Sequence, residues 1–318
     1  MTTVSTSAES FAATLALFTD ELGFQLELIT PADDPKMAVV VRGDDRVTIT
    51  RGPEAAAADK RPLTIPPLVS ELVISRATDD AGWVTGRAGM RYRDLIPSRL
   101  GGRFIASHIE VCDGGPVPDL VHHHAIRFQL IFCQRGWVDV VYEDQGPEFR
   151  MEAGDCVIQP PHIRHKVLAS SAGARVVEIG CPADHDTLFD YDMALPNERV
   201  DSVRRWDGQA FVRHIEAEAL WTDTGTEGFQ EQITAISRAT DGLADVRVLR
   251  RSGPGSFTAT AAVDGEFDFL FVLAGSGAID VPGEPLDAVE GDAITLPPGA
   301  TWAIDAADED FRLLRVRL

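Results

Sequence analysis

The sequence contains no run of apolar residues long enough for a membrane-spanning helix. Its first residues include neither a basic region nor a small-residue cleavage site, so we expect no secretory signal and a cytoplasmic protein. Positive charge is scarce, because 29 Lys and Arg stand against 50 Asp and Glu, which gives a net charge of −21. This charge repels phosphate backbones and anionic lipids, and no basic patch or helix-turn-helix pattern is present. We therefore expect neither a nucleic-acid nor a membrane partner.

Cysteine is also scarce. The four residues, Cys112, Cys133, Cys156 and Cys181, are widely spaced and form no CxxC pair. In a chain of 318 residues they do not suggest a disulfide scaffold, and they suit a reducing compartment. Three of the four lie in apolar, strand-like runs, where a free cysteine behaves as a small hydrophobic residue.

The first part of the chain, residues 1–72, predicts a small α+β appendage. An apolar stripe over 9–22 is typical of an amphipathic helix, and short extended runs follow over 24–29, 37–42 and 46–50. The proline- and alanine-rich stretch 52–67 is typical of a linker. The helix, the Leu-Gly-Phe at 22–24 and the PADDP turn resemble a fragment of a glyoxalase-type module whose usual metal ligands have no counterpart here. This resemblance implies a structural or dimer-forming role.

From residue 73 onward, short β-rich runs bounded by Gly, Pro or Asp dominate the sequence. Examples are RFIASHIEV, RFQLIFCQ, WVDVVYE and ARVVEIG. Many short strands at this spacing predict sandwiches or barrels rather than a parallel α/β sheet. After the polar connection that begins near residue 185, the pattern starts again with VRVLRR, FDFLFVLAG and FRLLRVRL. We therefore predict an all-β protein with two barrel domains, over 73–190 and 191–318.

Four residues of the first barrel region stand at the spacing of metal ligands. His122 and His124 are two apart, so both side chains point to one face of a strand. Gln129 opens the next strand, and His165 follows a Pro-Pro turn much later in the chain. Two imidazoles from one strand and a third from a neighbouring strand can converge on a cation inside a barrel. The sequence predicts one divalent metal ion here, with Gln129 as a fourth donor.

The segments that carry these residues resemble the two motifs of the cupin family. HHHAIRFQLIFCQRG resembles the first motif: HxH, four residues, an acidic or amide ligand, six residues, glycine. GDCVIQPPHIRH resembles the second, with His162 where the family usually has a turn glycine. The seventeen residues between Gly136 and Gly154 lie within the family's range. The resemblance implies two cupin barrels of the double-stranded β-helix, or jelly-roll, type. The layout is similar to that of gentisate- and salicylate-type dioxygenases, which implies iron in the first barrel.

Gln129 departs from the family, which commonly has glutamate at this position. A neutral amide oxygen is a weaker ligand than a carboxylate, leaves the metal a stronger Lewis acid and removes an obvious general base. This departure favours substrate chelation and oxygen activation over proton abstraction by this residue. The alternative is that Gln129 orients an imidazole or a water without binding the metal.

The C-terminal region repeats the second motif as GDAITLPPGATW, with Trp302 in place of the histidine. Counting back from Gly277, the first-motif positions fall on Val263, Gly265 and Leu270. None of these side chains can bind a metal. We therefore expect a degenerate, metal-free second barrel that serves packing or dimerisation.

Other polar residues are candidates for substrate contact. Arg127 shares the face of Gln129 if the strand is regular, where it would hold a substrate carboxylate or form a structural ion pair. His108 and Gln159 could line the same cavity, although a hydrogen-bonded core histidine is the alternative for His108. His162 flanks the turn before His165 and would be solvated or touch substrate.

These residues leave three hypotheses open. The first is a dioxygenase with Fe(II) on the three histidines, a small chelating substrate (an aromatic acid, enol or diketone) and Arg127 on a carboxylate. The second is an isomerase, lyase or hydrolase in which Zn, Mn or Ni polarises a carbonyl and His108 or His162 acts as base. The third is a non-catalytic small-molecule-binding barrel. A homodimer is expected because barrels of this kind have free sheet edges.

Overall fold

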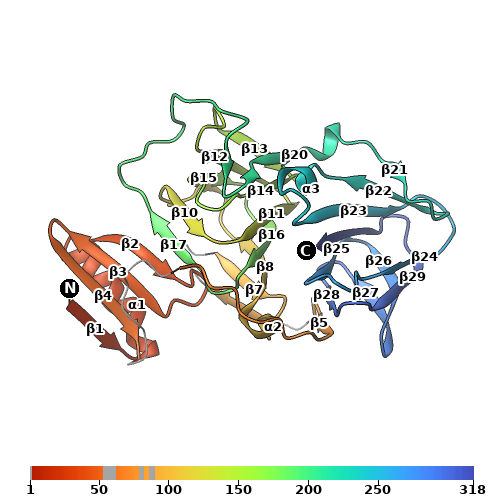
Figure 1. The fold of residues 1–318 in the computed structure, drawn as a ribbon, viewed down its shortest axis with the longest axis horizontal. Coiled ribbons are helices and arrows are strands. Elements are labelled where there is room, and N and C mark those ends of the chain that lie inside the picture. Colours follow the sequence, from red (N-terminus) through yellow and green to blue (C-terminus); the bar gives the residue numbers. More distant parts are fainter. Residues whose placement is uncertain (1, 53–61, 79–81, 86–89) are drawn as a thin grey trace.

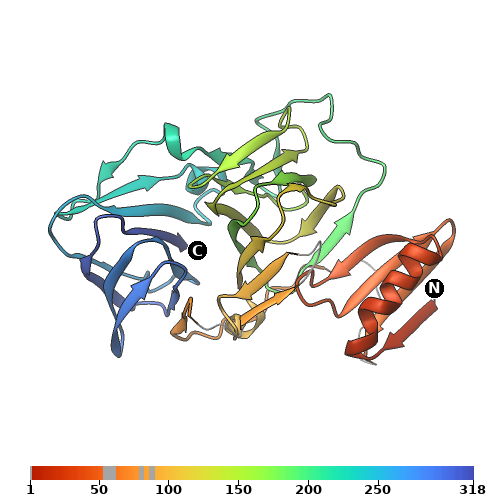
Figure 2. The ribbon, with the colours of Figure 1, turned by 180° about the vertical axis from the view of Figure 1, so that it is seen from behind.

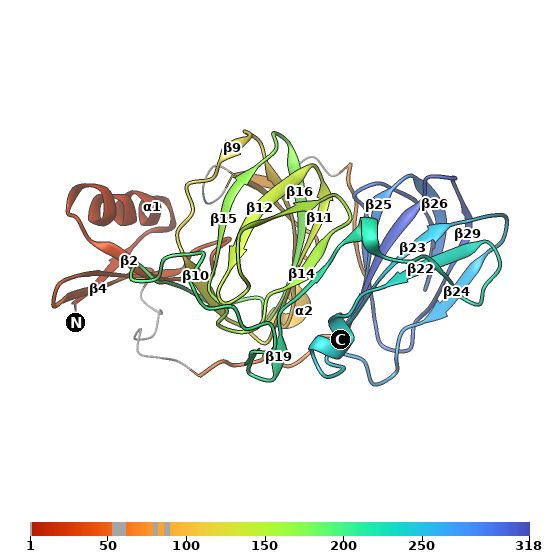
Figure 3. The same ribbon diagram turned by 90° about the horizontal axis from the view of Figure 1, so that it is seen from above.

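The computed structural model describes residues 2–52, 62–78, 82–85 and 90–318, and it contains three bodies in a row. A small α/β unit lies at one end, a first β-barrel in the middle and a second β-barrel at the other end (Figures 1 and 3). Strands dominate the described residues, in agreement with the predicted fold class. None of the described helices combines the length and apolar character that a bilayer crossing requires.

The N-terminal unit is a four-stranded sheet with one helix on its face (Figure 2). Its elements are β1 (Thr2–Thr6), α1 (Ala8–Ala16), the π-helical turn η1 (Leu17–Glu21), β2 (Gln25–Thr30), β3 (Met37–Arg42) and β4 (Asp45–Arg51). The helix begins after Ser7, whose hydroxyl accepts the backbone N–H of Ser10 at 3.3 Å. Phe11 on α1 packs against Val40 and Ile49 of the sheet. The helix and three strands predicted for this region are confirmed.

The sheet of the N-terminal unit continues into the first barrel. Strand β2 pairs with β17 (Asp186–Phe189), so Ile29 lies opposite Thr187. The unit therefore covers one edge of the barrel. Most of the predicted linker, residues 53–61, lies outside the described residues, and the likeness to a glyoxalase module stays a prediction.

The first barrel is built from two facing sheets, and its cavity lies between them. One sheet contains β9 (Gly115–Pro116), β10 (His122–Ala125), β12 (Trp137–Tyr142), β13 (Phe149–Glu152), β15 (His165–Ser170) and β17. The other contains β6 (Trp83–Thr85), β7 (Arg91–Asp94), β8 (Ile105–Val111), β11 (Phe128–Arg135), β14 (Cys156–Ile158), β16 (Ala174–Cys181) and β20 (Val212–His214). A short helical segment, α2 (Arg99–Gly102), precedes β8.

The second barrel repeats this plan. Its larger sheet contains β5 (Val73–Ser75), β21 (Thr222–Asp223), β22 (Phe229–Ile233), β23 (Asp245–Arg251), β25 (Asp268–Ala274), β28 (Ala293–Leu296) and β30 (Arg312–Arg317). The smaller contains β24 (Phe257–Thr260), β26 (Ser276–Val281), β27 (Glu284–Val289) and β29 (Thr301–Ala307). The connection between the barrels carries β18 (Arg205–Trp206), β19 (Gln209–Ala210) and the 3₁₀ turn η4 (Glu216–Glu218), and α3 (Ile236–Ala239) precedes β23.

Two strands cross between the barrels. Strand β5 lies within the range predicted for the first barrel, 73–190, but it pairs with β28 of the second barrel. Strand β20 lies within the predicted second domain but pairs with β14 of the first barrel. The boundaries at 72/73 and 190/191 remain predictions, and strand exchange ties the two barrels together across them.

A shared apolar core joins the barrels. It lies between the sheet of the first barrel that contains β11 and the sheet of the second barrel that contains β25. Phe104 of the first barrel stacks on Phe267 of the second, with ring centroids 4.3 Å apart. Phe128 and Phe132 on β11 and Phe269 on β25 belong to the same buried cluster. Aromatic pairs of this kind contribute about 0.5–1.5 kcal/mol each beyond the area they bury. The face of β11 opposite to this core is therefore held rigidly toward the barrel interior.

Candidate metal centre

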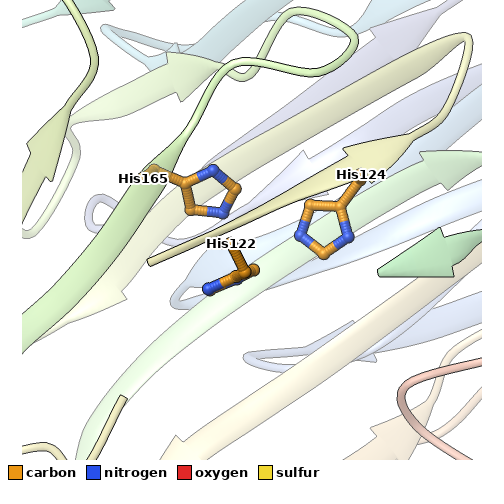
Figure 4. Close-up of side chains that lie close together, drawn as sticks. All are labelled: His122, His124 and His165. Atoms are coloured by element: carbon orange, nitrogen blue, oxygen red, sulfur yellow. The ribbon is translucent and has the colours of Figure 1, made fainter. Parts of the chain in front are cut away.

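Three buried histidines meet inside the first barrel. His122 and His124 point to the same face of β10, while His123 between them points away, as the two-residue period of a strand requires. Strand β15 runs antiparallel to β10 and places His165 directly opposite His122. One ring nitrogen from each of the three lies within 4.8 Å of the others. Figure 4 shows the three imidazoles gathered around a common point.

Hydrogen bonds set the tautomer of the rings. Because a backbone carbonyl can only accept, His122 Nδ1 donates to Leu120 O at 2.7 Å and His165 Nδ1 donates to Ile163 O at 3.0 Å. The Nδ1 atom of His124 lies 3.0 Å from Thr187 Oγ1. Partners at Nδ1 orient a ligating histidine and leave Nε2 as the nitrogen that carries the lone pair. The donor set therefore fits a divalent cation bound through three Nε2 atoms.

Gln129 adds an oxygen to this set. Its Nε2 donates to Glu178 Oε1 at 2.6 Å, because an amide nitrogen can only donate. This contact turns the amide so that Oε1 lies on its other side, where this buried atom accepts no hydrogen bond from any described residue. An unpaired buried oxygen costs about 1–3 kcal/mol, and a metal ion or a hydrogen-bond donor would remove that cost. The residues present therefore fit the metal that the sequence predicts.

A cavity of about 160 Å³ lies next to these donors. Tyr142, Gln159 and His185 line it together with the three histidines and Gln129. Gln159 Nε2 donates to the Tyr142 hydroxyl at 2.8 Å, and Gln159 Oε1 has no partner among the described residues. Burial raises the pKa of the Tyr142 phenol, so this group stays protonated and can donate into the cavity. The cavity thus offers one hydrogen-bond donor and one acceptor beside the metal ligands.

Arg127 does not lie in this cavity. Its guanidinium binds Glu266 of the second barrel, with Nη1–Oε2 and Nη2–Oε1 distances of 2.7 Å and 3.3 Å. The residue precedes β11, which begins at Phe128, so the strand alternation that was expected to turn it inward with Gln129 does not reach it. The structure therefore shows the ion pair that the sequence left open as the alternative, and a substrate contact of Arg127 stays a prediction.

His108 also faces away from the cavity. Its neighbours Ser107 and Ile109 line the cavity, so the alternation of β8 puts His108 on the opposite face. There its Nε2 donates to Gln134 Oε1 at 2.8 Å, and its ring packs against Phe271 of the second barrel. His108 is therefore a buried, hydrogen-bonded histidine between the barrels, and a catalytic role for it stays a prediction.

The two remaining candidates, Gln159 and His162, lie in different surroundings. Gln159 lines the cavity as predicted. His162 is exposed, with φ +64° at the turn position, and its Nδ1 lies 3.3 Å from His123 Nδ1. It does not line the cavity.

The strand register corrects the positions expected for the second barrel. Gly275, with φ +71° between β25 and β26, is the counterpart of Gly136, with φ +73° between β11 and β12. The motif positions expected for the second barrel were counted back from Gly277. The correct starting glycine is Gly275, two residues earlier in the chain. The connection that follows β24 is also longer than its counterpart in the first barrel, so counting alone gives no correct register.

Strand pairing identifies the true equivalents in the second barrel. Trp302 lies opposite Ala259, as His165 lies opposite His122, and Ala261 takes the position of His124. The equivalent of Gln129 is Asp268, whose carboxylate binds Arg315 at 2.6 Å. Trp302 and its apolar neighbours fill the space that is open in the first barrel.

Two residues of the site escaped the sequence reasoning. Glu178 lies in the apolar run ARVVEIG, and its place beside Gln129 depends on the pairing of β16 with β11. His185 follows a cis-proline turn, and its ring lies 5.3 Å from that of His124. Alternation within ARVVEIG puts Glu178 and Val176 on one face, but only the partner strand shows that this face is the interior.

The barrels and the histidine centre define a two-barrel protein of the cupin fold. No protein-family model matches the sequence, and no curated protein sequence matches it. Solved structures do match. A salicylate 1,2-dioxygenase from Pseudaminobacter salicylatoxidans aligns with a TM-score of 0.57 at 15% identity, over 80% of this chain and 86% of that one. An oxalate decarboxylase from Lactobacillus farciminis aligns with a TM-score of 0.57 at 12% identity, over 80% and 89%.

A putative glyoxylate-induced protein from Pseudomonas aeruginosa aligns with a TM-score of 0.56 at 15% identity, over 83% of this chain and 93% of that one. At these identities the likeness establishes the fold. It does not choose among the chemistries that these proteins carry out.

Proposed function

We propose that this protein is a metal-dependent dioxygenase that holds one Fe(II) ion in its first barrel and acts on a small chelating organic substrate. The observation that carries the proposal is the buried group of His122, His124 and His165, with the unpaired Gln129 Oε1, beside a cavity of about 160 Å³. Imidazoles suit Fe, Zn, Cu and Ni, and an iron centre with open positions supports oxygen chemistry. When bound, the metal polarises a chelated substrate and lowers the pKa of its ionisable oxygen.

The residues around the metal have separate tasks in this proposal. Gln129 and the three histidines hold the ion with four neutral donors, so the site keeps the full charge of the cation for an anionic ligand. The Tyr142 hydroxyl and Gln159 Oε1 orient the oxygen atoms of the substrate. The apolar walls exclude water, which strengthens each of these electrostatic contacts.

A specific observation supports a second candidate, a metal-assisted isomerase or lyase. That chemistry needs a base, and His108 and His162 do not line the cavity. Glu178 does line it and supplies a carboxylate that the sequence reasoning did not find. In this alternative Glu178 removes a proton from a substrate that is polarised by a redox-silent metal.

Metal analysis and oxygen uptake separate the two candidates. Protein purified without added metal is analysed by mass spectrometry for its metals, and oxygen consumption is recorded with enols, diketones and aromatic diols. Iron content and uptake that both disappear in His165→Ala support the dioxygenase. His162→Ala is the matched control, because His162 is three residues away and exposed. A redox-silent metal with no uptake would favour the second candidate, and an unchanged metal content in His165→Ala would remove both.

The oligomer and the compartment also remain proposals. The pairing of β2 with β17 covers one edge of the first barrel, whereas β1 ends the same ten-stranded sheet at its far side. A homodimer through such an edge strand is tested by light scattering of the purified full chain. A cytoplasmic location is tested by fractionation of the cells that produce it.

A further inference from the structure

Part of the cavity wall comes from the N-terminal unit. Ala32 and Asp33, in the turn between β2 and β3 (residues 31–36, the β2–β3 turn), line the cavity together with residues of the first barrel. The turn reaches this place because β2 runs beside β17, with Ile29 opposite Thr187 (Figure 1). The N-terminal unit therefore contributes surface to the site, in addition to covering one edge of the barrel.

A buried hydrogen bond fixes the start of the β2–β3 turn. Thr30, the last residue of β2, is 8% exposed, and its Oγ1 donates to His185 O at 3.1 Å. The next residue, Pro31, is buried, and the backbone N–H of Lys36 donates to Thr30 O at 2.9 Å, which closes the turn. Because His185 itself lines the cavity, Thr30 links the N-terminal unit to the backbone of a cavity residue.

Ion pairs with Arg99 hold the β2–β3 turn against the first barrel. The guanidinium of Arg99 lies 2.5 Å from Asp33, 3.3 Å from Asp184 and 3.4 Å from Asp94. Lys36 Nζ adds a contact of 2.8 Å to Asp184. The side chains of Arg99 and Asp33 are each 21% exposed, whereas those of Lys36 and Asp184 are about half exposed. Solvent screens the first pair less, so Arg99–Asp33 contributes more to holding the turn.

His185 brings this part of the wall next to the metal ligands. Its ring lies 5.3 Å from that of His124. Its Nδ1 donates to Pro182 O at 3.0 Å, because a backbone carbonyl can only accept, so Nε2 is left as a hydrogen-bond acceptor. The carbonyl of the same residue accepts from Thr30. The place of this ring in the cavity therefore depends on the N-terminal unit as well as on the barrel.

We infer that the β2–β3 turn is a specificity-determining wall of the substrate cavity. Ala32 sets a steric limit, because its small side chain leaves space that a larger one would occupy. Thr30 is a positioning residue, which acts on the substrate through His185. This inference rests on the metal centre proposed above, and it gives the N-terminal unit a part in substrate binding.

Anaerobic titration of the Fe(II)-loaded full chain with 4-nitrocatechol tests the steric limit. This aromatic diol chelates iron, and its absorbance reports binding. Ala32→Phe should weaken binding about tenfold, which corresponds to about 1.4 kcal/mol, while the iron content stays that of the parent. Ala32→Val should lie between the parent and Ala32→Phe. Parent-like affinity in both variants would overturn the inference.

The matched control is Ala13→Phe, because Ala13 is exposed on α1 of the same unit. It introduces the same ring far from the cavity lining and should bind 4-nitrocatechol as the parent does. An equal loss of affinity in Ala13→Phe and Ala32→Phe would show that the effect comes from disturbance of the N-terminal unit, which would also overturn the steric limit.

Two variants of Thr30 test the positioning role. Thr30→Val keeps the shape of the side chain and removes the hydroxyl, so binding of 4-nitrocatechol should weaken about fivefold in protein that retains its iron. Thr30→Ser keeps the hydroxyl and should bind as the parent does. A merely structural role would lower the melting temperature of Thr30→Val and leave the affinity of the iron-loaded protein unchanged, and this result would remove the positioning role.

The ion pairs give an independent order of effects. Asp33→Ala removes the less exposed pair with Arg99 and should weaken binding more than Lys36→Ala does. The reverse order would show that Arg99–Asp33 does not hold the turn.

The outcomes separate failure of the inference from failure of the proposed function. If the full chain binds no iron, both fall. If iron and 4-nitrocatechol bind but the variants at positions 30 and 32 bind as the parent does, the wall is wrong and the metal centre stands. If these variants lose affinity but the parent consumes no oxygen with diols, enols or diketones, the wall stands and the dioxygenase is wrong.

Discussion

Gln129 Nε2 donates to Glu178 Oε1 across 2.6 Å inside the first barrel, and the same two strand positions of the second barrel hold Asp268 and Arg315. One barrel therefore pairs an amide with a carboxylate where the other pairs a carboxylate with a guanidinium. The second pair neutralises itself and needs no ion. The first pair leaves the Gln129 amide oxygen without a hydrogen-bond partner among the described residues, and a glutamate at position 129 would place a second carboxylate beside Glu178.

Gln129→Glu should be poorly tolerated in the metal-free protein. The substitution sets two carboxylates in contact, so one of them must take up a proton or the pair must separate. We expect the free energy of unfolding at pH 8 to fall by about 1–3 kcal/mol, measured by urea denaturation. The double variant Gln129→Glu/Glu178→Gln restores one amide and one carboxylate and should recover most of the loss. A single variant as stable as the parent would contradict the assigned pairing.

Asp268→Asn should destabilise the chain strongly. Both partners of the Asp268–Arg315 pair are buried, and removing one leaves an uncompensated charge, which costs about 3–5 kcal/mol. Replacing both, with Asp268→Leu and Arg315→Met, should come within about 1–2 kcal/mol of the parent because apolar residues fill the same space. Denaturant titration of the three proteins checks this order. Equal stability of Asp268→Asn and the double variant would argue against a buried pair.

Arg127→Ala should affect the contact between the barrels and leave the metal centre intact. The Arg127–Glu266 pair is about 30% exposed on each side (29% and 31%), so its loss should cost no more than about 1 kcal/mol. Glu266→Ala should cost more, since it also leaves Arg103 without that acceptor. Melting temperature and metal content are measured on both variants. Loss of metal in Arg127→Ala but not in Glu266→Ala would show a role at the site.

His108 should make the protein less stable in mild acid. Burial, the largest cause, lowers the pKa of His108 from 6.5 to about 4. Between these values the unfolded chain binds the proton and the folded chain does not, so stability falls as the pH drops from about 6.5 toward 4. The full difference corresponds to about 3 kcal/mol.

His108→Gln provides the comparison for this acid sensitivity, because glutamine keeps a hydrogen-bonding group and cannot titrate. Unfolding free energies of parent and variant are measured at pH 7 and pH 4.5. The parent should lose more stability between the two pH values than the variant does. Equal losses would mean that the pKa of His108 is not lowered in the folded protein.

The sequence by itself determined the metal-ligand candidates and the type of fold. The HxH spacing placed His122 and His124 on one face, because side chains alternate along any strand, and the turn glycines and prolines marked where strands end. These are local properties, which a linear sequence contains in full. The repeated motif GDAITLPPGATW also predicts the second barrel from the sequence alone.

Only the tertiary structure decided which face of each strand is the interior and which strands are neighbours. The alternation of side chains along a strand does not determine that Ser107 of β8 points inward and His108 outward. It also does not determine that β11 begins after Arg127. The pairing of β16 with β11 brought Glu178 to Gln129 across 49 residues of sequence. Strand pairing is a long-range choice made by burial and packing, so the partner of Gln129 emerges only when the sheets close into a barrel.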